Sequence, residues 1–226
     1  DREVKTDAFS LFDGSQLASE TQSLKAADPL TMGTTSAALV YDNSIFGATG
    51  PILGQRYRLE ASPTFGSSSY VGVLADWRRY FMLKRPFTLA ARLMHYGRYG
   101  SGAEDPRFQA LFLGYPGLVR GYRYGSFSGS ECNPPPGSPN SCPVFDQLLG
   151  SRIAVANLEL RFPLFGVLHL GSGYYGMLPI DWTIFGDAGM AWTGEESPSL
   201  SGGDRTPVYS AGTGFRFNLF GFAVAR

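Results

Sequence analysis

The sequence predicts an all-β protein, specifically an antiparallel transmembrane β-barrel of about eight strands. Seven runs of about 10 to 14 residues alternate apolar and polar side chains, which is the period of extended chain and not of helix. Glycine, tyrosine and phenylalanine are abundant, at 29, 12 and 17 residues, which suits many strands and turns. No apolar run approaches the ~18 residues that a membrane-spanning helix requires.

The alternating runs divide most of the chain into strands of similar length. In the run 152–165, Ala154 and Leu158 face one side, whereas Asn157 and Glu159 face the other. We expect strands at 37–46, 55–65, 70–83, 87–99, 152–165, 181–192 and 208–219, with a short final strand beginning at 222.

Two architectures are compatible with this alternation. In a soluble sandwich or barrel the apolar face is the core, whereas in a membrane barrel it meets lipid and the polar face lines the lumen. The runs exceed the ~5–6 residues of typical soluble strands and match the ~9–11 that cross a bilayer at a tilt. The polar faces combine arginines with carboxylates, and aromatic residues gather near the ends of the runs, as in interfacial girdles. These details favour the membrane barrel.

The alternation also indicates how the chain is organised. Residues 1–35 are polar and weakly periodic, so we expect a linker or loop there, followed by the β-barrel domain at 36–226. The loops 100–150 and 194–206 fall on one side of the barrel, because an even number of strands separates them. Outer-membrane barrels have long loops outside and short turns in the periplasm. We therefore expect the long loop 100–150 to be extracellular and the turn 84–86 to be periplasmic.

The two cysteines, Cys132 and Cys142, both lie in a segment rich in proline and glycine within the long loop. Their spacing suits a local disulfide that closes a small loop, and a disulfide indicates an oxidising compartment. The alternative is a pair of free thiols.

Charge and motif content indicate a protein without catalytic chemistry. Lys+Arg and Asp+Glu are both 19, so the net charge suggests no nucleic-acid partner. The only histidines are His95 and His169, and no Cys/His group has the spacing of metal ligands. Phe127 stands at the centre of 125–129, where a nucleophile elbow would have serine. We expect no enzyme activity, no cofactor and no metal.

Four features in chain order resemble the C-terminal barrel region of the BamA-like superfamily, which contains outer-membrane assembly factors, two-partner-secretion transporters and bacterial surface antigens. The long loop contains Val119-Arg120-Gly121-Tyr122, and the next strand contains Asn157-Leu158-Glu159-Leu160-Arg161. The strand after that contains Phe185-Gly186-Asp187-Ala188-Gly189, and a glycine-rich strand ends in Phe217-Asn218-Leu219-Phe220-Gly221. The resemblance covers residues 36 to 226.

The resemblance implies a loop-to-lumen lock formed by Val119, Arg120, Gly121, Tyr122, Glu159 and Asp187. In the family the loop folds back into the barrel, and its arginine pairs with acidic groups on the inner wall. Carried over, Arg120 would meet Asp187 and Glu159, which the alternation independently places on the polar face. Gly121 would allow a tight backbone turn beside the arginine. The alternatives are a solvated Arg120 in an ordinary loop, and an Asp187 paired with a neighbour such as Arg216.

The chain departs from the family in its number of strands. Family barrels have sixteen strands, and this sequence supplies about eight. The chain is therefore expected to be the C-terminal half of a sixteen-stranded barrel, a small eight-stranded barrel, or a barrel that needs partner strands, because open edges are not tolerated in lipid.

The resemblance further implies residence in the outer membrane of Gram-negative bacteria and a non-covalent role in the insertion or transport of polypeptides. The expected partners are outer-membrane lipid and other polypeptides, either substrate barrels or a subunit that supplies further strands. A second hypothesis is a structural barrel subunit or anchor in a larger envelope complex, without transport activity. A third, a barrel-borne hydrolase, lacks a nucleophile and a base in this sequence.

Overall fold

The computed structural model describes residues 2–9, 16–24, 29–127, 142–196, 198–202, 205–219 and 223–225. The chain divides into two compact units, Asp1–Thr31 and Met32–Arg226.

The first unit contains a β-hairpin where we expected a polar linker or loop. Strand β1 (Arg2–Phe9) pairs antiparallel with β2 (Gln16–Leu24), and Arg2 lies opposite Leu24. Residues 2–9 and 16–24 are therefore strands and not the loop that we expected. The sequence of these two stretches contains few large apolar residues, so the apolar–polar alternation that indicated the other strands is weak here.

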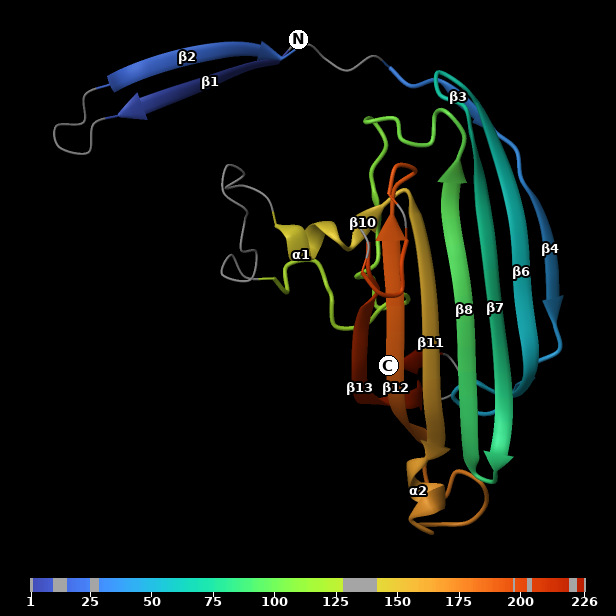
Figure 1. Cartoon of the computed structure of the whole chain (residues 1–226). Coiled ribbons are helices and arrows are strands. Elements are labelled where there is room, and N and C mark those ends of the chain that lie inside the picture. The colour runs from blue at the N-terminus through green and yellow to red at the C-terminus, as the bar shows by residue number, and fades with distance from the viewer. Residues whose placement is uncertain are drawn as a thin grey trace. The chain divides into compact units, whose positions relative to one another are not determined.

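The second unit is built on one large antiparallel sheet that contains all of the expected strands (Figure 1). The run expected at 37–46 is split in two, and β6 begins four residues earlier than expected. The strands of this sheet are β3 (Met32–Thr34), β4 (Ala37–Asp42), β5 (Ile45–Phe46), β6 (Pro51–Gly66), β7 (Tyr70–Lys84), β8 (Phe87–Tyr99), β11 (Arg152–Pro163), β12 (Ile180–Trp192), β13 (Val208–Leu219) and β14 (Ala223–Ala225). The predicted all-β class is confirmed.

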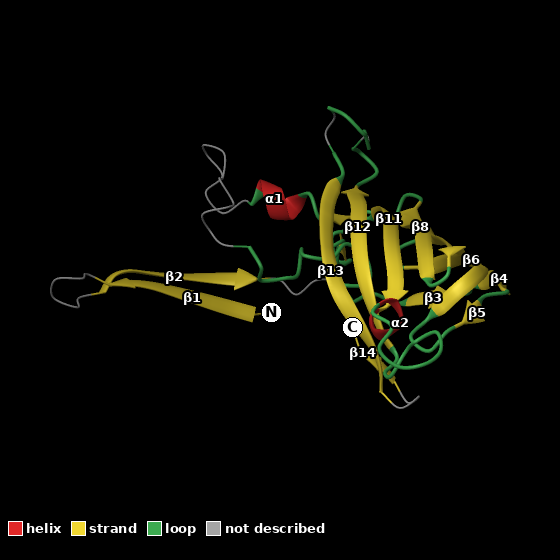
Figure 2. Cartoon of the chain, turned by 90° about the horizontal axis from the view of Figure 1, so that it is seen from below, coloured by secondary structure: helices red, strands yellow, loops and turns green. Residues whose placement is uncertain are grey.

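The sheet is a curved wall whose strands follow one another in space in the order β14-β13-β12-β11-β8-β7-β6-β3, with β4 and β5 also paired to β6. Figure 2 shows the arc that these strands form when viewed along their length. The long loop separates β8 from β11 in sequence, yet the two strands pair directly, with Gly97 opposite Arg152. Among the described residues, the pairings end at β14 on one side and at β3 and β4 on the other.

The antiparallel register aligns inward-facing residues into rows that cross the sheet. One row runs through Asp42, Arg56, Arg78, Arg92, Asn157, Asp187 and Ser210, which occupy seven neighbouring strands. The alternate residues of the same strands, such as Leu93 and Leu158, face the opposite side. Each strand therefore presents its polar residues to one face and its large apolar residues to the other, as the alternation predicts.

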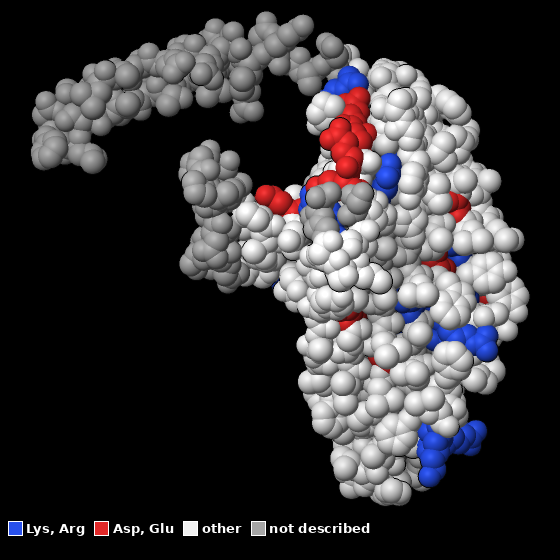
Figure 3. All heavy atoms as spheres, viewed as in Figure 1, with Lys and Arg blue, Asp and Glu red and all other residues white. Residues whose placement is uncertain are grey.

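The outward side of the sheet exposes large apolar side chains. Leu93, Leu158 and Ile184 keep about half of their surface accessible, at 55%, 50% and 48%. Most of the face seen in Figure 3 is uncharged, and its charged groups are scattered between the two ends. A contiguous apolar surface of this kind suits contact with lipid. Within the described part of the chain, no helix is long and apolar enough to span a membrane.

The segments that connect the strands differ between the two ends of the sheet, and the long loop lies at one end only (Figure 1). The long loop includes β9 (Leu111–Phe112), α1 (Pro143–Asp146) and β10 (Leu149–Gly150), and β10 pairs with β9. Short helix α2 (Leu164–Val167) lies at the opposite end, in the connection between β11 and β12. The turn between β7 and β8 is also at that opposite end.

The inner face is not polar throughout, contrary to the expectation of a polar lumen. Leu113, Val119 and Leu148 from the long loop are fully buried against the inward-facing side chains of Ile153 and Val155 on β11. The strand residues near the loop end are apolar on both faces, so alternation alone could not show that the loop would pack there. The loop thus supplies a small hydrophobic core to one end of the inner wall.

Candidate functional site

The side chain of Arg120 lies against the inner wall and forms an ion pair with the carboxylate of Asp187. Its Nε donates to Asp187 Oδ2 at 2.7 Å and its Nη2 to Oδ1 at 2.6 Å, which is a two-pronged pairing. The backbone N–H of Arg120 donates to the same Oδ2 at 3.1 Å. The Asp187 side chain has no exposed surface, whereas that of Arg120 is 26% exposed. A rigid guanidinium fork matches a carboxylate in this geometry.

The remaining amino group of Arg120 reaches the next strand. Its Nη1 donates to Glu159 Oε1 at 2.7 Å. The other oxygen of Glu159 accepts from Arg161 Nη2 and from Arg216 Nη2, each at 2.6 Å. Glu159 therefore joins three guanidinium groups, and Arg216 lies beside Glu159 and not in the alternative pairing with Asp187 that the sequence left open.

Phe185 supports the arginine from one side, and the sequence had not singled it out for this role. The guanidinium carbon of Arg120 lies 3.5 Å from the centre of the Phe185 ring, a cation–π contact. Phe185 stands opposite Glu159 in the register and two residues before Asp187, so all three side chains face inward. The alternation could have revealed it, because residues 185 and 187 share a face.

Two further polar side chains hold the backbone just before Arg120. Asn157 Nδ2 donates to the carbonyl of Leu118 at 2.7 Å and to Asp187 Oδ1 at 2.8 Å. Arg92 Nη1 donates to the carbonyl of Gly117 at 2.6 Å. Asp76 fixes Arg92 in turn, accepting two hydrogen bonds of 2.9 and 2.8 Å. These contacts depend on the path of the loop backbone, for which the sequence offered no signal.

The other residues of the 119–122 motif differ in how they contact the inner face of the sheet. Val119 is fully buried, and a Cβ on Gly189 would lie 2.4 Å from its Cγ2, so any larger residue at 189 would force Val119 to shift. Gly121 has φ of +93°, a conformation that side chains other than glycine's rarely adopt. Tyr122 donates its hydroxyl hydrogen to the carbonyl of Tyr209 at 2.7 Å.

The structure thus brings together all six residues that the sequence indicated for the lock. Arg120, Asp187 and Glu159 form one ion-pair network, and Val119, Gly121 and Tyr122 place the loop around it. A cavity of about 710 Å³ adjoins this network on the concave side of the wall. We call the contacts of 117–122 with the wall the loop latch.

The disulfide prediction lies partly outside the described residues. Cys142 is disulfide-bonded. Cys132, the other cysteine of the sequence, lies outside the described residues.

Fold and site together define a class: a membrane β-barrel wall with a long loop latched to its inner face. The Omp85 superfamily domain matches residues 11–222, and the chain belongs to the Omp85 superfamily. The resemblance seen in the sequence is therefore confirmed. A comparison with curated proteins found no match for the chain.

Membership of the Omp85 superfamily indicates the broad class of function. Omp85 superfamily proteins are outer-membrane β-barrels of Gram-negative bacteria and organelles that serve in protein insertion and secretion. They work with other polypeptides and with the outer membrane, as transporters or assembly factors and not as enzymes.

Proposed function

We propose that this chain is the barrel domain of a bacterial outer-membrane protein that inserts or transports polypeptides without a covalent step. The observation that supports this proposal most directly is the loop latch, in which Arg120 ties the long loop to two strands of the inner wall. A loop that is fixed to the inner wall keeps the shape of the barrel interior constant. Substrate polypeptides can then pass through this interior or pair with the barrel strands.

The energetics favour a latch that stays closed in the resting protein. Removing one partner of a buried ion pair costs ~3–5 kcal/mol, because the other charge is left without compensation. The side chain of Asp187 has no exposed surface, and without the Arg120 guanidinium it would keep only the neutral hydrogen bonds from Asn157 and from the backbone N–H of residue 120. We expect the latch to hold the loop and to be required for activity.

In this proposal the loop 100–150 is extracellular, and polypeptides are handled by non-covalent contacts alone. Partners are then outer-membrane lipid and either substrate barrels or a subunit that supplies further strands. No nucleic acid, cofactor or metal is part of the proposal.

The test is replacement of the wild-type protein in its own cells by an Arg120→Ala variant. We expect folded outer-membrane proteins or secreted passengers to decrease, with unfolded forms accumulating in the periplasm. Arg123→Ala is the matched control, because Arg123 is an exposed arginine three residues further along the same loop. It should behave as wild type.

Depletion of the whole protein separates this role from that of a structural anchor. We expect depletion to reduce the assembly or secretion of other polypeptides. Normal assembly and secretion after depletion, combined with loss of a larger envelope complex, would contradict the proposal and favour the anchor.

A further inference from the structure

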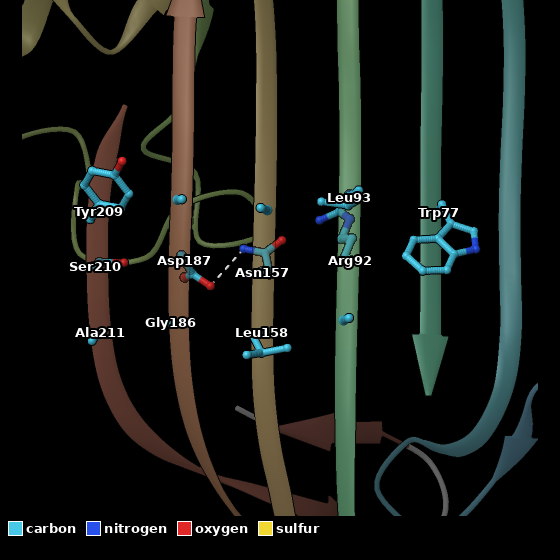
Figure 4. Close-up of a pocket in the computed structure, with 13 residues that line it drawn as sticks. Trp77, Arg92, Leu93, Asn157, Leu158, Gly186, Asp187, Tyr209, Ser210 and Ala211 are labelled. Atoms are coloured by element: carbon cyan, nitrogen blue, oxygen red, sulfur yellow. Dashed lines mark hydrogen bonds between the residues drawn. The ribbon is translucent and has the colours of Figure 1, made fainter. Parts of the chain in front are cut away.

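The outward side of the sheet has a hollow that the loop latch does not use. Its floor consists of small residues on four neighbouring strands, and large side chains stand around it (Figure 4). The floor is formed by Ala91, Ala156, Gly186, Ala188 and Ala211, and the rim by Trp77, Leu93, Leu158 and Tyr209. The cavity measures about 670 Å³. We call it the outer hollow.

The outer hollow continues toward the end of the sheet that bears the long loop. A second cavity of about 410 Å³ shares Trp77, Leu93 and Ala156 with the first and extends it past Ala154 and Met190. The register places Ala154 opposite both His95 and Met190, one step nearer the loop than Ala156. The two cavities therefore form one apolar groove along the strands.

A polar cluster ends this groove on the loop side. Arg152 stands two residues before Ala154, and its guanidinium carbon lies 4.5 Å from the centre of the Tyr99 ring. His95 shares a hydrogen bond of 2.7 Å with the Tyr99 hydroxyl and stacks on Trp192, with ring centres 5.7 Å apart. Among the described residues, no carboxylate oxygen lies within 4.0 Å of a nitrogen of Arg152, whose Nε makes a long hydrogen bond of 3.4 Å to the carbonyl of Arg98. The nearby Glu104 lies on the other side of Gly194, where its Oε1 accepts hydrogen bonds from Ser151 Oγ and from the Gly194 N–H.

We propose that the outer hollow and Arg152 bind one phosphorylated membrane lipid, with an acyl chain along the small-residue floor and the phosphate at the guanidinium. The chemistry is complementary at both ends: an apolar groove suits a hydrocarbon chain, and an arginine without a carboxylate partner suits a phosphate. The aromatic residues between them, Tyr99 and Trp192, are the types that occupy the headgroup level of membranes.

The dimensions fit one leaflet. Six residues separate Arg152 from Leu158, which is ~20 Å along a strand. A barrel strand tilted by ~40° descends about 15 Å over that length, close to half of the ~30 Å hydrocarbon core. The site therefore spans the leaflet on the side of the long loop. It depends on the sheet facing lipid and not on polypeptide transport, so it can fail or succeed separately from the proposed function.

The experiment uses the full chain in phosphatidylcholine vesicles that contain a small fraction of phosphatidylglycerol with a photoactivatable acyl chain. After illumination, mass spectrometry of peptides locates the lipid adducts. In the wild type we expect adducts concentrated at 154–158 and 186–190. Arg152→Gln should weaken the labelling about fivefold, as expected for the loss of one cationic contact with an anionic lipid. Ala156→Phe should remove the adducts from the hollow by filling it.

Two controls match these variants on the same face of the sheet. Arg79→Gln removes an outward arginine that hydrogen-bonds Gln55 at 2.8 Å and lies outside the groove. Ile184→Phe enlarges an outward side chain that is also outside the groove. Both should label as the wild type does. Adducts spread evenly over the outward face, or unchanged labelling in both Arg152→Gln and Ala156→Phe, would overturn the proposal. So would protein–protein cross-links at 156 that replace the lipid adducts, because they would assign the hollow to a second copy or another barrel.

Discussion

The two sides of β11 have different environments, although their residues alternate along a single strand. Leu158 points outward and is half exposed on a face that suits lipid. Its neighbour Glu159 points inward, is almost fully buried and joins the guanidinium groups of three arginines. On this strand the outward face therefore exposes an apolar side chain, whereas the inward face buries a carboxylate that is paired with three arginines.

A second difference lies within the inner wall itself. Near the loop end the wall is apolar, and Val119 packs against Val155 and Ile153. Further along, the same wall is ionic, and Arg120 meets Asp187 and Glu159. Two adjacent residues of one loop thus use hydrophobic burial and ion pairing side by side.

The largest expected effect comes from removing the ionic half of the latch. Arg120→Ala should lower the free energy of unfolding by about 3 kcal/mol, at the low end of the range for buried pairs because Arg120 is itself partly exposed. Limited proteolysis of the loop and urea unfolding in vesicles would measure this. Arg123→Ala is the control and should leave both readouts unchanged. Equal protease resistance in all three proteins would contradict the role of Arg120.

A charge on the outward face should cost slightly less. Leu158→Arg places a guanidinium near the middle of β11 on the side that meets lipid, where such a substitution costs ~2–4 kcal/mol. Urea unfolding in vesicles should show a loss of about 2 kcal/mol. The comparison variant Tyr209→Arg lies near the loop end of β13 on the same face, and its loss should be smaller. A soluble fold with a water-facing outer side would show no loss for either variant.

A substitution at Gly189 tests the hydrophobic half of the loop latch. Gly189→Ala would place a Cβ 2.4 Å from Val119 Cγ2, and overpacking of this kind costs ~1–3 kcal/mol. We expect a loss of about 1 kcal/mol, since one methyl group can be accommodated by a small loop shift. Gly186→Ala on the same strand is the control, because a Cβ there meets nothing within 4 Å. A loss of the same size in both variants would show that strand propensity and not the loop contact is responsible.

The smallest effect concerns pH and the exposed part of the loop. Hydrogen bonds from the Arg107 guanidinium and backbone N–H lower the pKa of Asp105 from 3.8 to about 2. Because the pKa in the folded chain is lower than that of the unfolded chain, this contribution to loop stability is present above pH 4 and is lost as pH falls toward 2. NMR titration of the Asp105 carboxyl carbon would measure the shift. Arg107→Gln should raise the pKa of Asp105 part of the way toward its ordinary value, because the guanidinium is lost while the backbone N–H of residue 107 remains. An unshifted wild-type pKa would contradict the contact.

The sequence was sufficient to predict the strands and the main charged residues of the site. Alternation placed Glu159 and Asp187 on the same face, and the resemblance pointed to Arg120, so their meeting in the structure agrees with both lines of reasoning. It was not sufficient for Asn157 and Arg92 as holders of the loop, because these side chains bind backbone carbonyls whose positions depend on the loop path.

Two other features could not be predicted from the sequence, and the reasons are physical. The sequence of β1 and β2 contains few large apolar residues, so little apolar–polar alternation marks these strands. The small core around Leu113 and Leu148 forms from loop residues that lie in no periodic segment. Packing of a loop against a wall is a tertiary event, and local periodicity contains no information about it.

The most direct test of the loop latch is a double-mutant cycle between Arg120 and Asp187. Unfolding free energies of Arg120→Ala, Asp187→Ala and the double variant are measured in vesicles of one composition. A direct, largely buried pair predicts a coupling energy of about 2 kcal/mol, so the double variant should lose much less than the sum of the single losses. Additive losses, within about 0.5 kcal/mol of the sum, would contradict the account by showing that the two groups act independently.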